Sequence, residues 1–293
     1  MRRRDMTMGS GAPQWRTSRY LIDLTLPRVM GIVNVTPDSF SDGGQHASTA
    51  DALRHCEQLL ADGAHILDIG GESSRPGALP LPLEEELARI VPVVRHAVAL
   101  GVPVSVDTYK PEVMRLVLDL GADIINDIWA LRQPGAADVV AQQPNCGVCL
   151  MHMHREPQTM QMQPMQGDVV PQIVEFLSHA AERLLGLGMQ PQQIVVDPGI
   201  GFGKTVAQNF SLLQRQAELA AAGYPVLAGW SRKSSLAAAT STSLANLASM
   251  DPRARMVPSV TAAVLAVERG ARIVRVHDVR ETVQALAVLA SIA

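Results

Sequence analysis

The 293-residue chain is poor in aromatic residues and cysteines and carries little net charge. Phe, Trp and Tyr make up 3% of it, so its core must be built from aliphatic residues and Met. Three cysteines are an odd count that does not suggest a disulfide framework, and a cytoplasmic location is expected. The net charge of -3 gives no reason to expect nucleic acid or a membrane as partner. No apolar run is long enough to span a bilayer.

The composition is that of a globular protein with a large core. Hydrophobic residues make up 47% and charged residues 18% of the chain. The basic start, Met1-Arg2-Arg3-Arg4, is not followed by the apolar segment of a signal peptide. We expect residues 1–19 to be a disordered leader and residues 20–293 to form a single domain.

Short apolar, β-branched segments alternate with segments of helix length along the chain. Strands are expected to begin near Val29, Ile66, Val102, Ile124, Val148, Ile194, Val226 and Ile273. Helices are predicted over residues 51–62, 82–100, 111–120, 167–187, 208–222, 259–269 and 281–293. Eight such strand–helix units in under 300 residues predict an α/β protein with a (β/α)8 TIM barrel fold.

Each predicted strand ends in a polar group. These groups are Asn34, Glu72 with residues 73–75, Asp107, Asn126 with Asp127, His152, Asp197, Ser231 with residues 232–233, and Arg275 with His277. In barrel enzymes the active site is built at the C-terminal ends of the strands. The sequence therefore predicts one active site lined by these side chains.

Seven segments resemble the signatures of dihydropteroate synthases, in the order of that family. They are MGIVNVTPDSFSDGG (30–44), DIGGESSRPGA (68–78), VDTYKP (106–111), INDI (125–128), DPGIGFGK (197–204), GWSRKS (229–234) and RVHD (275–278). The resemblance spans roughly residues 20–290, and collinear motifs of this length are far more specific than one short pattern. It implies a cytoplasmic transferase of folate biosynthesis, a homodimer whose substrates are a pterin diphosphate and p-aminobenzoate.

The resemblance implies which residues hold the pterin. A carboxylate can accept both hydrogen bonds from the ring amide and the 2-amino group, and Asp197 matches the family's residue for this task. Lys233 matches the lysine near the ring carbonyl and N5. The remaining matches for the pterin site are Asp107, Asn126, Met151 and Gly229.

The same resemblance places the diphosphate and the second substrate. The diphosphate is expected at Asn34, Arg75, Arg275 and His277, with Asn34 as a ligand of Mg²⁺, which prefers oxygen donors. The pocket for p-aminobenzoate is expected to include residues 38–45, Ser74, Arg75, Pro76, Phe202, Ser231 and Lys233. The catalytic residues implied in this way are Asp107, Asp197, Lys233, Arg275 and His277.

One departure and two alternatives accompany this interpretation. The family usually has Thr where this chain has Ser74, which affects the expected affinity for p-aminobenzoate and sulfonamides. A pterin-dependent methyltransferase would keep the carboxylates, but would have no diphosphate for residues 74–76 and 231–234 to hold. An inactive pterin-binding paralogue is the second alternative.

Three motifs are interpreted as structural. Cys146 and Cys149 have redox or metal spacing, but they flank an apolar strand and have no second pair. The glycine-rich segment 199–205 fails the phosphate-loop pattern, because Pro198 stands where glycine is required. The Met-rich segment 151–165 fits a pocket lining better than a soft-metal site.

Overall fold

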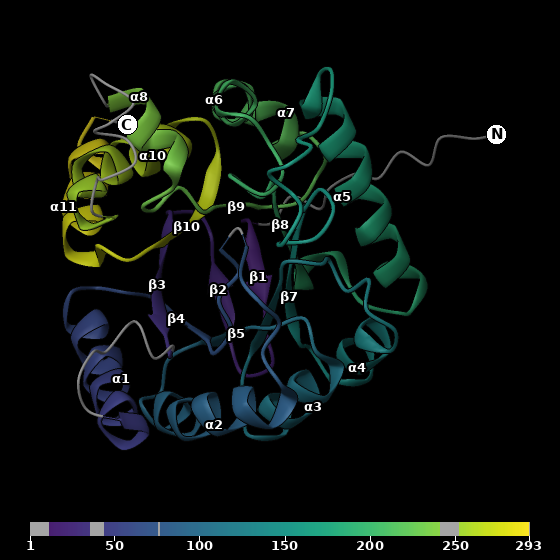
Figure 1. Ribbon diagram of the computed structural model, residues 1–293, viewed down its shortest axis with the longest axis vertical. Helices are drawn as coiled ribbons and strands as arrows, with labels where there is room; N and C mark the ends of the chain where they lie inside the picture. The colour runs from purple at the N-terminus through teal and green to yellow at the C-terminus, as the bar shows by residue number, and fades with distance from the viewer. Residues whose placement is uncertain (1–11, 36–43, 76, 241–251, 293) are drawn as a thin grey trace.

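A computed structural model describes residues 12–35, 44–75, 77–240 and 252–292, and within them eight parallel strands form a closed barrel (Figure 1). The order around the barrel is β10-β3-β4-β5-β6-β7-β8-β9. The strands are β3 (Arg28–Asn34), β4 (Ile66–Gly70), β5 (Val104–Asp107), β6 (Ile124–Asp127), β7 (Gly147–Met151), β8 (Ile194–Asp197), β9 (Val226–Ala228) and β10 (Ala271–Val276). The predicted fold class is confirmed.

Helices surround the barrel, and all seven predicted helical segments are helical. They are α1 (Gly44–Ala61), α2 (Leu83–Ala99), α3 (Pro111–Asp119), α5 (Val169–Gly186), α6 (Val206–Gln214) with α7 (Gln216–Ala220), α10 (Met256–Glu268) and α11 (Val279–Ala290). The short helices α4 (Ala136–Gln142) and α8 (Ser234–Thr240), and the 3-10 turns η2 (Pro191–Gln193) and η3 (Pro252–Arg255), were not predicted. Among the described residues, no helix is long and apolar enough to cross a membrane.

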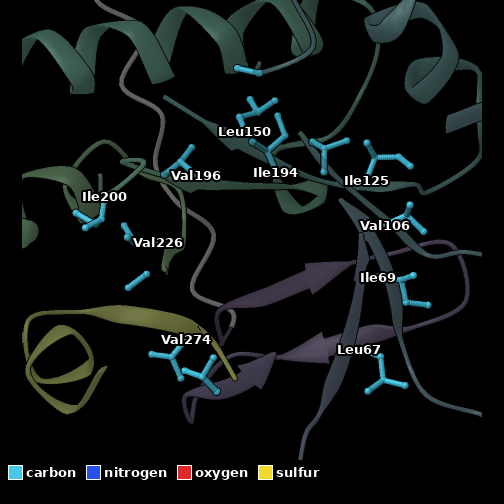
Figure 2. Close-up of a cluster of buried hydrophobic side chains, with 14 of the residues drawn as sticks. Leu67, Ile69, Val106, Ile125, Leu150, Ile194, Val196, Ile200, Val226 and Val274 are labelled. Atoms are coloured by element: carbon cyan, nitrogen blue, oxygen red, sulfur yellow. The ribbon is translucent and has the colours of Figure 1, made fainter. Parts of the chain in front are cut away.

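Successive residues of each strand face either the helices or the inside of the barrel. Leu67, Ile69, Val106, Ile125 and Val274 belong to the large cluster beneath the helices (Figure 2). Their neighbours one position away fill the barrel with a second cluster, which includes Met30, Ile66, Ile124, Cys149, Val195, Leu227 and Ile273. Because side chains alternate along a strand, residues two positions beyond the members of this second cluster also point into the barrel.

A β-hairpin closes the barrel at the N-terminal ends of its strands. The hairpin consists of β1 (Gln14–Arg16) and β2 (Leu21–Asp23), and Trp15 is fully buried in the inner cluster. The indole of Trp15 donates to the carbonyl of Gln193, one residue before β8. The prediction that the leader extends to residue 19 is therefore wrong for residues 14–19, because Trp15 anchors the hairpin. Residues 1–11 lie outside the described part of the chain.

The inward alternation brings the predicted site residues together at the opposite end. Two positions beyond Ile124, Cys149, Val195 and Ile273 stand Asn126, Met151, Asp197 and Arg275. The strand register pairs Asn34 with Gly70, Gly70 with Asp107, Asp107 with Asn126, and Met151 with Asp197. The last inward residues of the strands thus form one ring at the C-terminal end of the barrel.

Candidate active site

Arg275 crosses the inside of the barrel and binds two carboxylates on other strands. Its Nε donates to Asp68 Oδ2 at 2.5 Å and its Nη2 to Asp107 Oδ2 at 2.7 Å. The amide nitrogen of Asn126 lies 3.3 Å from the same oxygen of Asp68. Burial raises the pKa of Asp107 to about 7, against the influence of Arg275, which lowers it. This cluster of charges joins β4, β5, β6 and β10 on one side of the site.

Asp197 ends β8 as a buried carboxylate. Its Oδ1 accepts from the backbone N–H of Gly199 at 2.7 Å. Burial raises its pKa, while the Gly199 hydrogen bond and the charges of Lys233, Lys204 and Arg275 act to lower it. A Cβ atom on Gly229 would lie 3.6 Å from Asp197 Oδ2, so the glycine keeps the space beside this oxygen open.

Lys233 reaches the site from the loop that follows β9. Its ammonium lies 4.3 Å from the centre of the Phe202 ring, which belongs to the β8–α6 loop. Burial lowers the pKa of Lys233 to about 8, although Asp197 acts to raise it. Phe202 itself packs in a small apolar cluster at the mouth of the barrel, with Ile128, Met151, Met153 and Met160.

His277 is held between two predicted site residues. The hydroxyl of Ser231 lies 2.9 Å from His277 Nδ1 and accepts from the His277 backbone N–H at 3.1 Å. Asn34 Nδ2 is 3.5 Å from His277 Nε2. Burial lowers the pKa of His277 well below its ordinary value, as do the nearby charges of Arg232, Arg275, Lys233 and Arg75. At neutral pH the imidazole is therefore uncharged.

The donor atoms present fit the Mg²⁺ expected at Asn34. The amide nitrogen of Asn34 faces His277, and its side-chain oxygen is the hard donor that Mg²⁺ prefers. Among the described residues there is no group of three or more His, Cys, Asp or Glu that could hold a metal ion. A site with one protein oxygen, completed by phosphate and water, needs no such group.

The second loop rests on an ion-pair network that follows β4 and β5. Lys110 Nζ binds Glu72 and also the fully buried Glu86, the latter at 2.5 Å. The hydroxyl of Tyr109 donates to Glu72 at 2.9 Å, two residues before Ser74. Ser74, Asp107, Tyr109 and Trp129 are among the residues that line the adjoining pocket. The loop carrying Ser74 is therefore fixed at its base.

Parts of the predicted site for the second substrate lie outside the described residues. Residues 36–43 of the first loop and Pro76 of the second are in this group. Ser74 is half-buried and Arg75 is exposed, yet Arg75 is near enough for its charge to act on His277. The described part of the expected pocket consists of residues 44–45 at the start of α1, together with Ser74, Arg75, Phe202, Ser231 and Lys233.

Some polar groups at strand ends face away from the site. Asp127 accepts from the backbone N–H groups of Trp129 and Leu131, so it caps a turn. His152 packs edge-on against Phe176 of α5, at 4.9 Å between ring centres. Arg232 pairs with Asp278 at 2.6 Å. One position of difference along a strand thus separates the residues that face the site from those that stabilise its surroundings.

Three residues were overlooked that the structure places in or beside the site. Asp68 interrupts the apolar strand of residues 66–69, and this was the available signal for an inward-facing charge. Lys110 is partly buried, and its partners Glu72 and Glu86 lie far away in the sequence and could not be read from it. Lys204 is buried, and its bond to the carbonyl of His152, in another segment, could not be read from the sequence either. All three hold other site residues in place.

Two of the motifs interpreted as structural, the cysteines and the Met-rich segment, lie among buried apolar residues. Cys56, Cys146 and Cys149 are buried and free, and burial raises the pKa of Cys146 to about 12. Such thiols are unreactive. Met151, Met153 and Met160 line the apolar cluster at the mouth, as expected of a pocket lining.

Comparison with known proteins identifies the class first. The family model described as "Pterin binding enzyme" matches residues 30–277, which includes seven complete strands of the barrel, the eighth strand β3 from Met30 onward, and all the candidate site residues. Such barrels bind their ligands at the end where Asp107, Asn126, Asp197 and Arg275 converge. The fold and the family match define a pterin-binding enzyme.

Relatives of this class narrow the assignment. Dihydropteroate synthase of Neisseria meningitidis serogroup C is 48% identical over 275 residues, covering 93% of this chain and 95% of the relative. The Escherichia coli K12 enzyme is 45% identical, covering 92% of each chain. Xanthomonas albilineans dihydropteroate synthase with 4-aminobenzoic acid superimposes with a TM-score of 0.88 at 46% identity, covering 96% and 98%. The chain belongs to the dihydropteroate synthase family, the transferases that act in folate biosynthesis.

Proposed function

We propose that the chain condenses 6-hydroxymethyl-7,8-dihydropterin diphosphate with p-aminobenzoate, giving 7,8-dihydropteroate and diphosphate. The observation that carries the proposal is the convergence of Asp107, Asn126, Asp197 and Lys233 beside Arg275 and His277. Acidic and amide groups suited to a pterin thus lie next to basic groups suited to a diphosphate. The Burkholderia cenocepacia synthase in complex with 7,8-dihydropteroate, 47% identical with a TM-score of 0.86, supports this choice.

The pterin is assigned to the carboxylate side of the site. Asp197 has one oxygen bound to Gly199 N–H and the other beside the open space at Gly229. It can therefore accept from the donor edge of a pterin ring while its orientation stays fixed. Asp107 and Asn126 are assigned to other polar atoms of the ring, and Met151 to one of its faces. Lys233 is assigned to the ring carbonyl and N5.

The diphosphate is assigned to Asn34, Arg75, Arg275 and His277. Arg275 and Arg75 supply positive charge, and His277, being neutral, donates or accepts a single hydrogen bond. Mg²⁺, when bound at Asn34, supplies further neutralisation of the leaving group. The residues themselves orient the diphosphate away from the ring, so that its bond to the pterin methylene carbon is exposed to attack.

The second substrate is assigned to the pocket of Ser74, Arg75, Pro76, Phe202, Ser231 and Lys233. The neutral arylamine nitrogen is already a nucleophile and needs no activating triad. It attacks the methylene carbon, the carbon–oxygen bond to diphosphate breaks, and the nitrogen then loses a proton. Asp107 and Asp197 stabilise positive charge that develops on the pterin, so catalysis rests on positioning and electrostatics.

Two finer features belong to the same proposal. A homodimer is supported by Val257 on α10 and by Val288 and Ile292 at the end of α11, which are 67%, 68% and 80% exposed. A cytoplasmic location is supported by the three free thiols. Light scattering of the purified protein tests the dimer, and a mass of one chain at micromolar concentration would contradict it.

A turnover assay tests the function. Purified protein with Mg²⁺ and both substrates is expected to release one diphosphate for each 7,8-dihydropteroate formed. Diphosphate release without dihydropteroate, or no turnover at all, would contradict the proposal and favour an inactive pterin-binding paralogue. Methyl transfer from a methylated pterin to a corrinoid would favour the methyltransferase.

A further inference from the structure

Lys204 is a buried lysine whose hydrogen bonds go to other residues of the protein, and burial lowers its pKa to about 7 although Asp197 acts to raise it. It lies in the loop that precedes α6, and its relative exposure is 2%. The ammonium donates to three backbone carbonyl oxygens: Gly199 at 2.8 Å, Phe202 at 3.1 Å and His152 at 3.3 Å. All three of its N–H groups are therefore used. Although its motif looks like that of a phosphate loop, this lysine has no donor left for a phosphate.

The three carbonyl groups belong to segments that build the site. Gly199 is the residue whose N–H donates to Asp197, so its peptide groups link Lys204 to that carboxylate. Phe202 carries the ring beneath the Lys233 ammonium. His152 directly follows Met151 at the end of β7. One ammonium thus ties together the ends of β7 and β8 and the loop between them and α6.

The loop packs closely against the segment that follows β7. A Cβ atom on Gly199 would lie 2.0 Å from the carbonyl oxygen of His152, and one on Gly203 would lie 2.7 Å from His154 Cβ. Both glycines have positive φ, a conformation that other residues rarely adopt. The loop therefore lies directly against the β7–α5 segment. The carbonyl of Gly199 also accepts from the backbone N–H of Phe202 at 3.1 Å, and Lys204 supplies a further donor to it and donors to the carbonyls of Phe202 and His152.

We propose that Lys204 is a positioning residue for the reaction, which holds Asp197 and Phe202 in their working orientation through hydrogen bonds to the loop backbone. The inference rests on the proposed function, since it assigns a task to the support of that site. Because backbone carbonyl groups use all three of its N–H groups, Lys204 is assigned to neither substrate. Its removal should therefore act on both substrates at once, through Asp197 on the pterin and through Phe202 on p-aminobenzoate.

The test compares Lys204→Met and Lys204→Gln with the wild-type enzyme. Met keeps the length of the side chain without donors, whereas Gln retains two N–H donors without the charge. For Lys204→Met, kcat/KM for pterin diphosphate is expected to fall about thirtyfold, the scale for loss of a supporting contact. The KM for p-aminobenzoate is expected to rise about fivefold, because Phe202 loses its fixed place. Lys204→Gln is expected to lie between Met and wild type.

Ile22→Ala is the matched control for lost stability. Ile22 is buried in the hairpin at the opposite end of the barrel, so its truncation lowers Tm without touching the site. Its kinetic constants are expected to stay within about twofold of wild type, since stability and site geometry are separate here. Thermal unfolding of all variants gives the Tm against which the kinetic losses are compared.

Three results would overturn the proposal. Wild-type kcat and KM in Lys204→Met, with only a lower Tm, would make the role merely structural. If Lys204→Gln were no more active than Lys204→Met, the site would depend on the charge of Lys204 and not on its hydrogen bonds. If Lys204→Met does not fold, wild-type kcat and KM in Lys204→Gln, with only a lower Tm, would likewise make the role merely structural. An inactive wild-type protein would instead defeat the proposed function.

Discussion

The ammonium group of Lys233 lies 4.3 Å from the centre of the Phe202 ring, although the two residues come from different loops. This contact places a positive charge on an aromatic face at the point where both substrates are assigned. It also joins the β9–α8 and β8–α6 loops across the mouth of the barrel. A cation over an aromatic face contributes about 0.5–2 kcal/mol.

Replacing Phe202 should weaken the second-substrate pocket. For Phe202→Leu, the KM for p-aminobenzoate is expected to rise about tenfold, roughly 1.4 kcal/mol, because both the stacking face and the support of Lys233 are lost. The KM for pterin diphosphate should change less. Phe210→Leu, on α6 against Trp230, is the control because it removes an aromatic contact outside the site. Equal effects on both substrates would contradict the assignment.

Asp197→Asn should reduce turnover about a hundredfold, roughly 3 kcal/mol of transition-state stabilisation. The amide keeps one oxygen that can accept from Gly199 N–H, so the loop geometry is expected to survive. It cannot accept two hydrogen bonds from the pterin, and it carries no charge against the developing cation. Steady-state kinetics beside a circular dichroism spectrum measure this. Turnover within threefold of wild type would remove Asp197 from the mechanism.

The pH dependence of kcat/KM for pterin diphosphate should be bell-shaped and narrow. Burial raises the pKa of Asp107 to about 7, and this carboxyl is active only when ionised, so activity rises with pH through that range. Burial lowers the pKa of Lys233 to about 8, and this amine is active only when protonated, so activity falls above it. Lys233→Arg should remove the alkaline limb. A profile that stays flat from pH 5 to 10 would exclude both groups.

Lys110→Met should destabilise the protein by about 3 kcal/mol, because it leaves the buried carboxylate of Glu86 without its cation. Thr108 would remain as its one side-chain partner, at 2.8 Å. The double variant Lys110→Met with Glu86→Gln should recover about half of the loss, since the unpaired charge is gone. Urea unfolding measures both. A loss below 1 kcal/mol in the single variant would mean that solvent already stabilises Glu86.

Ser74→Thr restores the residue usual in the family and adds one methyl group to the second loop. If this group packs, p-aminobenzoate and sulfonamides should both bind tighter by no more than about 1 kcal/mol. Sulfonamide inhibition should be competitive with p-aminobenzoate, and the KM for pterin diphosphate should stay unchanged. A Yersinia pestis synthase crystallised with a sulfonamide drug complex is 42% identical to this chain. A change confined to the KM for pterin diphosphate would mean that the loop carrying Ser74 contacts the pterin substrate and not p-aminobenzoate.

The barrel could be predicted because each strand is a short apolar segment followed by a polar residue. The observed strands contain or closely overlap all eight predicted segments. The hairpin could not, since three-residue strands carry too few residues for a periodic signal. Helix α4 is also short, with only seven residues. Its N-cap residue is Gly135, which has no side chain to cap the helix, so the sequence lacks the Ser, Thr, Asp or Asn that usually marks a helix start.

The expected site residues at strand ends lie together at one end of the barrel, whereas the residues that support them could not be predicted. Asp197 and Arg275 stand at strand ends, where position alone suggests a role. Asp68 and Lys204 act through contacts with Arg275 and with backbone carbonyl groups. Which carbonyl lies near a lysine is decided by tertiary packing, and a linear sequence does not contain that information without the fold. Family resemblance names residues that touch ligands and omits those beneath them.

In the part of the chain that the structure describes, the hairpin covers the N-terminal ends of the strands and leaves the opposite end, where the site lies, as the entrance to the barrel. Trp15 and the apolar side chains above it fill the interior, so nothing can pass through from below. Both substrates must arrive, and both products must depart, through the same opening. In the proposed assignment the pterin part of the product lies beside Asp107, Asn126 and Asp197 inside the barrel and the aminobenzoate part lies at the loops, so release of the pterin part is expected to follow movement of the outer groups. We therefore expect product release through this opening, rather than bond formation, to limit the rate of the cycle.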